Sequence, residues 1–262
     1  MPQQSTAQFD SAVGLVAGGH GHRSRHYLFE NFLHAPGVNA DVVGTTTLGA
    51  ITNRQFEIVG TNAVSADSLL DDNGGIKITT NGGGADQAII VPHVDASQSG
   101  WSLTNGVVWD TDQAPAVEFK FKTDSSIADM IYYQGFVMTN PATYAVSDDA
   151  DRVVIDYNAD SSVNSGKFRL AYSVAGTDYT HDFGLTVTAS TTYIGQIFIR
   201  EDRYVDAFIG AANDMGAAKH VRTANKMTAN IATFIPTFAI EETTGSAKTA
   251  YLRYVAAGIN TN

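Results

Sequence analysis

The chain has 262 residues, with 27 acidic against 16 basic side chains, and a formal net charge of −11. It contains no cysteine, which excludes disulfide bonds, thiolate metal sites and cysteine nucleophiles. The acidic balance argues against a nucleic-acid partner, and the apolar runs are too short for a membrane-spanning helix, so we expect no membrane partner. An apolar fraction of 44% is enough for a large core.

Residues 1–53 are predicted to form an extended N-terminal arm that depends on a partner surface for its order. Glycines interrupt the arm, and its polar run ends at His26 before bulky apolar residues begin. The spacing of His20, His22 and His26 could suit a metal, but no fourth strong ligand is nearby, so docking on an acidic neighbouring subunit is favoured. The predicted interface residues of the arm are His20, Arg23, Arg25, His26, Tyr27, Phe29, Phe32 and Leu33.

From residue 54 onward, the sequence alternates between apolar and polar residues in short runs that end in Gly, Asn, Asp or Ser. The clearest run is 116–122, where Val117, Phe119 and Phe121 would face a core and the intervening Glu and Lys residues would face out. The other predicted strands are 55–59, 75–80, 87–91, 130–137, 152–157, 167–173, 192–199, 204–209, 231–240 and 250–256.

About a dozen strands at this spacing, with almost no helical periodicity, predict an all-β protein. We expect an antiparallel β-sandwich of the jelly-roll type over residues 54–262, in one domain. Weak helical patterns occur only at 63–70 and 213–218. Trp101 and Trp109 are interpreted as core residues, because large aromatic side chains more often fill a sandwich core than stack on a sugar.

The order of several segments resembles a known family. These segments are the aromatic and acidic run 27–32, the turn 71–75, the strand start 86–88, the alternating strand 115–121 and the run 132–136. Together they resemble the concanavalin A-like jelly-roll structural proteins of tailed-bacteriophage virions, of the capsid decoration or cement type. The resemblance implies a non-enzymatic protein on the capsid surface that forms a homo-oligomer, as a trimer, and binds and stabilises the major capsid protein. It supplies no catalytic residues.

Two other functions stay open on the same fold. One is a carbohydrate-binding, lectin-like domain of a tail fibre or spike. The other is glycan hydrolysis, which needs two carboxylates on one face of a groove. Related hydrolases carry a Glu-x-Asp-x-x-Glu strand, whereas here Lys120 follows Glu118 where the second acid would stand. The sequence therefore favours a protein that is not an enzyme.

One acidic loop could hold a cation. Asp156, Asn158 and Asp160 place three oxygen-bearing side chains at alternate positions, as Ca²⁺ prefers. Ser161 and Lys167, however, stand where an EF-hand loop has Gly and Glu, and the same residue types are common in hairpin loops. The loop interpretation is favoured over calcium, and the run 71–73 is likewise expected to be a solvated turn.

Overall fold

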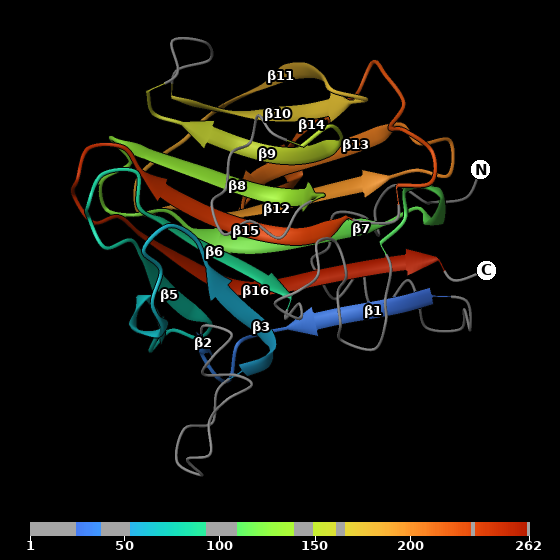
Figure 1. Ribbon diagram of the computed structural model, residues 1–262. Helices are drawn as coiled ribbons and strands as arrows, with labels where there is room; N and C mark the ends of the chain where they lie inside the picture. The colour runs from blue at the N-terminus through green and yellow to red at the C-terminus, as the bar shows by residue number, and fades with distance from the viewer. Residues whose placement is uncertain are drawn as a thin grey trace.

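The computed structural model describes residues 25–37, 53–92, 109–138, 149–160, 166–231 and 234–260. Within these ranges, two eight-stranded sheets pack face to face as a β-sandwich (Figure 1). This confirms the predicted all-β sandwich. The helical turns in the described ranges are far too short to cross a membrane.

The first sheet, sheet A, has the strand order β14-β13-β12-β7-β16-β5-β4, and β1 pairs with β16 beside this path. Its neighbouring strands are antiparallel. The strands are β1 (Arg25–Glu30), β4 (Ser68–Leu70), β5 (Ile76–Thr79), β7 (Ala116–Lys122), β12 (Thr192–Ile199), β13 (Val205–Ala211), β14 (Lys219–Arg222) and β16 (Thr249–Asn260).

The second sheet, sheet B, has the order β11-β10-β9-β8-β15-β6-β3-β2. All its neighbours are antiparallel except β2 and β3, which run parallel. Its strands are β2 (Pro36–Gly37), β3 (Asn53–Val59), β6 (Gln87–Pro92), β8 (Met130–Val137), β9 (Arg152–Asn158), β10 (Lys167–Val174), β11 (Thr177–Thr186) and β15 (Ile235–Glu242).

The main core lies between the two sheets and is rich in aromatic side chains. Phe121 of β7 is at its centre, with ring centroids 5.4 Å from Phe238, 5.9 Å from Tyr132 and Tyr193, and 6.2 Å from Phe168. These rings come from strands of both sheets, so the contacts hold the layers together. Trp109 is also buried, as predicted, at 1% exposure, whereas Trp101 lies outside the described residues.

The N-terminal boundary of the sandwich differs from the prediction. Strand β1, Arg25–Glu30, was expected to belong to the arm, but it pairs antiparallel with β16 of the same chain over six residues (Figure 1). Phe32 is buried at 2% exposure and packs edge-on against Phe56, with ring centroids 5.4 Å apart. Residues 25–37 therefore belong to the sandwich, because their backbone and apolar groups complete its layers.

The two weak helical patterns form only single 3-10 turns. The first pattern contains η1 (Ser65–Asp67) and then strand β4. The carboxylate of Asp67 accepts a hydrogen bond from the backbone N–H of Val64 at 2.9 Å, which stabilises a tight turn in place of a helix. The second pattern contains η3 (Met215–Ala217), and a third turn, η2 (Thr111–Gln113), precedes β7.

Candidate binding pocket

The outer face of sheet A carries polar side chains on its central strands. The alternation of β7 is as predicted: Val117, Phe119 and Phe121 are buried in the core, and Lys120 and Lys122 lie on the opposite face, half-buried. Glu118 is on this outer face as well, yet it is only 1% exposed. A buried carboxylate needs hydrogen-bond donors to offset the loss of water.

Neighbouring strands supply those donors to Glu118. The side-chain amide of Gln196 on β12 donates to one carboxylate oxygen at 2.5 Å. The hydroxyl of Tyr254 on β16 donates to the other oxygen, also at 2.5 Å. Because Glu118 accepts both bonds, it fixes the position of the Tyr254 ring on the outer face of the sheet.

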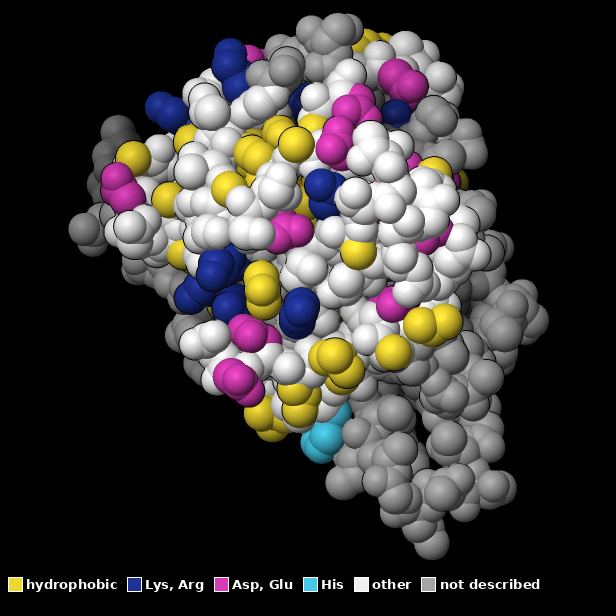
Figure 2. Space-filling model, turned by 90° about the vertical axis from the view of Figure 1, so that its left-hand side faces the viewer, with side chains coloured by type: hydrophobic (Ala, Val, Ile, Leu, Met, Phe, Trp, Pro, Cys, Tyr) yellow, Lys and Arg dark blue, Asp and Glu magenta, His cyan; other side chains and the backbone are white. Residues whose placement is uncertain are grey.

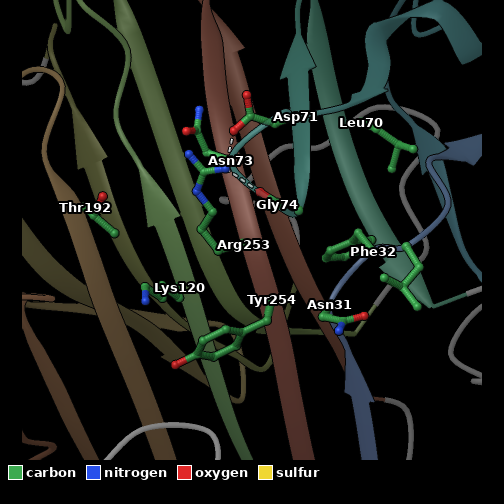
Figure 3. A pocket seen from close by; sticks show the side chains of 12 residues that line it. Asn31, Phe32, Leu70, Asp71, Asn73, Gly74, Lys120, Thr192, Arg253 and Tyr254 are labelled. Atoms are coloured by element: carbon green, nitrogen blue, oxygen red, sulfur yellow. Dashed lines mark hydrogen bonds and ion pairs between the residues drawn. The ribbon is translucent and has the colours of Figure 1, made fainter.

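A pocket of about 620 Å³ lies next to this network. Tyr254, Lys120 and Thr192 come from the sheet, and the turn after β1 and the β4–β5 turn supply the other walls (Figure 3). Its lining residues are Asn31, Phe32, Leu33, Leu70, Asp71, Asn73, Gly74, Gly75, Lys120, Thr192, Arg253 and Tyr254. The pocket thus combines apolar and aromatic surface with carboxamide, hydroxyl and charged groups.

An irregularity in β16 brings two consecutive side chains to this pocket. The register between β16 and β7 shifts between Leu252 and Tyr254, which is a β-bulge at Arg253. In a regular strand, neighbouring residues face opposite sides of the sheet, whereas a bulge re-aims one of them. Figure 3 shows Arg253 directed toward Asp71, Asn73 and Gly74, and Tyr254 extended across the neighbouring strand that carries Lys120.

The wall around Arg253 is held by an ion pair. Its guanidinium donates to the carboxylate of Asp71 and to the carbonyl oxygen of Gly74. Burial raises the pKa of the Asp71 carboxyl, but the hydrogen bond and charge of Arg253 outweigh that effect, so this pKa lies below its ordinary value. Asp71 is therefore ionised at neutral pH. The Asp71 side chain is only 13% exposed and is paired with Arg253 in the pocket wall. The sequence-based expectation of a solvated turn is therefore wrong for this residue.

The turn that carries Asp71 has a strict backbone requirement. The N–H of Gly74 donates to the carbonyl of Asp71 at 2.8 Å, and the N–H of Asp71 donates to the carbonyl of Gly75 at 3.1 Å. Gly75 has a φ of 77°, and a side chain there would come within 2.2 Å of the Leu252 carbonyl oxygen. Only glycine fits this position, so the turn packs directly on β16 and forms the pocket wall.

The predicted interface residues divide into several groups. Leu33 is 72% exposed and Phe29 is 45% exposed, and the Phe29 ring lies 5.9 Å from the Tyr254 ring. Phe32, in contrast, is a core residue whose edge lines the pocket. Three further residues, Arg25, His26 and Tyr27, belong to β1, and only their backbone is described. His20 and Arg23 lie outside the described residues.

The structure gives no support to the calcium interpretation of the acidic loop. Asp156 lies on β9 at 1% exposure, and its two oxygens accept hydrogen bonds from Nε and an Nη of Arg169, both at 2.7 Å. The side chain of Asn158 accepts from the backbone N–H of Asp160, as in an ordinary polar turn. Within the described ranges, no three Asp, Glu or His side chains form a cluster that could hold a metal.

Comparison with solved structures supports the fold. The chain is similar to a protein of unknown function from Shewanella oneidensis MR-1, with a TM-score of 0.58 and 14% identity over 91% of this chain and 87% of that one. It is similar to peanut lectin, with a TM-score of 0.54 and 13% identity over 89% and 97% of the two chains. It is also similar to basic winged bean lectin, with a TM-score of 0.54 and 10% identity over 91% and 100%.

These similarities show that the chain has a concanavalin A-like β-sandwich fold, the fold that the lectins above also have. No protein-family model matches the chain, and no curated protein sequence matches it. At such low identity, the likeness extends to the fold alone. The virion part of the sequence resemblance has no support from these structures and stays a prediction.

Proposed function

We propose that this protein is a non-catalytic carbohydrate-binding protein whose ligand occupies the pocket on the outer face of sheet A. The observation that carries the proposal is the Tyr254 ring, fixed by Glu118 beside a pocket of about 620 Å³. Small-molecule sites are commonly concavities of about 300–1,000 Å³ that combine apolar surface with a few placed polar groups. The pocket has both.

The pocket chemistry matches the two faces of a sugar ring. The C–H face of a sugar packs against an aromatic ring such as Tyr254, while its hydroxyl groups need both donors and acceptors. Asn31 and Asn73 offer carboxamides, Thr192 offers a hydroxyl, and Arg253 offers N–H groups. The fold also supports this proposal, because solved lectins have the same fold.

A non-catalytic role is part of the same proposal. Among the described residues that line the pocket, the only carboxylate is Asp71, and Arg253 neutralises it. Glu118 lies next to the pocket, but both its oxygens accept hydrogen bonds. Retaining and inverting hydrolases need a carboxylate pair that faces the scissile bond. The side chains at 120 and 122 on the same strand face are lysines.

The test of carbohydrate binding is removal of the tyrosine ring. We expect Tyr254→Ala to weaken binding to any glycan that the wild type selects on a glycan array by at least about tenfold in calorimetry, because the aromatic contact is lost. Tyr204→Ala is the matched control: this tyrosine is also half-buried, but it packs on Arg222 and Lys226, away from the pocket. No binding by the wild type would refute the proposal.

An assembly role is a second candidate, because three exposed apolar side chains lie at or beside the pocket. The large hydrophobic residues exposed in the described ranges are Phe29, Leu33, Val64, Leu69 and Leu70. Leu33 and Leu70 line the pocket rim, and Phe29 contacts Tyr254. Such grouped apolar surface is typical of a protein interface. We propose that this surface serves the role that the sequence resemblance implies, that of a virion subunit which forms a homotrimer and decorates the capsid.

The assembly role predicts a change in oligomeric state. We expect the double variant Leu33→Glu with Leu70→Glu to dissociate the wild-type oligomer in analytical ultracentrifugation, because two charges would be buried at the contact. Lys219→Glu on β14 is a control for the added charge, since that side chain is exposed on another part of sheet A. A wild-type protein that stays monomeric, or an unchanged double variant, would refute this role.

A further inference from the structure

Cations gather on the outer face of sheet A around two tyrosines. Lys77 of β5 and Lys122 of β7 flank Tyr251 of β16 in one cross-strand row. The Lys122 ammonium lies 5.4 Å from the centroid of the Tyr251 ring, and the Arg253 guanidinium carbon lies 5.6 Å from it. Lys120 is opposite Tyr254 in the register and lines the pocket.

Positively charged side chains also lie close together on one side of the molecule. Figure 2 shows Lys and Arg side chains gathered beside hydrophobic and acidic ones, on the side that faces left in Figure 1. Lys122 is opposite Thr192 in the register between β7 and β12, and Thr192 lines the pocket. The cationic row therefore runs into the pocket.

Among the residues that line the pocket, two cations, Lys120 and Arg253, stand against one carboxylate, Asp71, although the chain as a whole is acidic. Asp71 is bound by Arg253, and Glu118, which lies beside the pocket, is enclosed by two hydrogen-bond donors. Within the described ranges, neither Lys120 nor Lys122 has a carboxylate in ion-pair distance. A net charge of −11 makes a group of unpaired cations beside a pocket conspicuous.

We infer that the pocket selects an anionic saccharide, with carboxylate or sulfate groups on its sugar rings. This inference rests on the proposed carbohydrate-binding function and names its ligand class. The sugar ring packs on Tyr254, and its acidic group meets the ammonium of Lys120, which is a flexible point charge with three donors. Lys122 and Lys77 contact the acidic groups of the next sugar units along the saccharide.

The test compares ligands that differ only in charge. We expect an oligogalacturonate to bind about tenfold more tightly than its methyl ester in calorimetry at low salt, since a charge-assisted contact is lost in the ester. A sulfated galactan oligosaccharide and its desulfated form distinguish sulfate from carboxylate. We expect Lys120→Gln to lower the affinity for the acid far more than the affinity for the ester, so that most of the preference for the acidic form is lost.

Controls separate a specific contact from general attraction. Lys219→Gln on β14 removes one exposed positive charge at a distance from the pocket, and we expect it to preserve the preference. Equal affinity for acid and ester, or an equal effect of both lysine variants, overturns this inference while leaving carbohydrate binding intact. If the protein binds neither member of either ligand pair and no glycan on the array, the proposed carbohydrate-binding function itself is overturned.

Discussion

Asp156→Ala is expected to lower the free energy of unfolding by about 3–5 kcal/mol, because it leaves the partner of a buried ion pair without its counter-charge. Asp156 is 1% exposed, and Arg169 holds both of its oxygens at 2.7 Å. Burial raises the pKa of the Asp156 carboxyl, and the hydrogen bonds from Arg169 oppose that shift. Denaturant unfolding followed by circular dichroism measures the loss.

A neighbouring ion pair supplies the control for Asp156. Lys167, on the same strand as Arg169, pairs with Asp182 at 3.0 Å, and its side chain is 42% exposed. Lys167→Ala is expected to cost about 0–1 kcal/mol, since water screens such a pair. The double variant Asp156→Ala with Arg169→Ala should lose less than the sum of the two single variants.

Denaturant unfolding also tests whether Asp156 binds calcium. With both oxygens of Asp156 bound by Arg169, added Ca²⁺ should leave the unfolding midpoint of the wild type unchanged. A midpoint that rises with Ca²⁺ in the wild type and not in Asp156→Ala would contradict the ion-pair account and restore the calcium interpretation. A loss below about 1 kcal/mol in Asp156→Ala would show that the pair contributes little to the fold.

The central strands of the sandwich could be read from the sequence because they alternate strongly. The inward set Val117, Phe119 and Phe121 is confirmed as core, since a period of two is the direct consequence of the pleat. Strand β11 was missed, because its residues are mostly polar and exposed and it lies at the edge of sheet B. An edge strand with little buried surface leaves only a weak apolar signal.

The pocket could not be predicted from the sequence, because it depends on contacts between distant segments. Arg253 and Tyr254 reach it together only because β16 has a bulge, which depends on its pairing with β7. Asp71 becomes a wall residue only because Gly75 lets its turn pack on Leu252. One local signal was present: the run Asp-Asp-Asn-Gly-Gly at 71–75 already predicted a tight turn.

The placement of Glu118 connects the sequence argument to the pocket. On the outer face of β7, Glu118 is followed by two lysines, Lys120 and Lys122, and not by a second acid. The structure uses the single acid to hold Tyr254, and Lys120 stands at the pocket. This strand face therefore carries lysines where glycan hydrolysis would need a second carboxylate, and such cations favour the anionic ligand that we propose.

Deletion of residues 1–33 is expected to unfold the protein, although the sequence predicts that these residues belong to an extended arm, residues 1–53. The deletion removes β1, which pairs with β16 over six residues, and it removes the buried Phe32. Loss of a buried Phe side chain alone costs about 3–5 kcal/mol, and each lost backbone hydrogen bond adds about 1 kcal/mol. Together these approach the whole stability of a typical domain, about 5–15 kcal/mol.

Deletion of residues 1–24 is the matched control, because it leaves β1 and every described contact of Phe32 in place. We expect this shorter variant to keep the wild-type far-ultraviolet circular dichroism spectrum and a cooperative thermal transition, whereas the longer deletion loses the transition. If the longer deletion instead unfolds at the wild-type midpoint, β1 contributes nothing to the sandwich and residues 25–33 are free to reach another subunit. If the longer deletion unfolds the protein as expected, residues 25–33 are part of the folded sandwich. Any interface near the pocket must then form on a surface that is already folded before the partner binds.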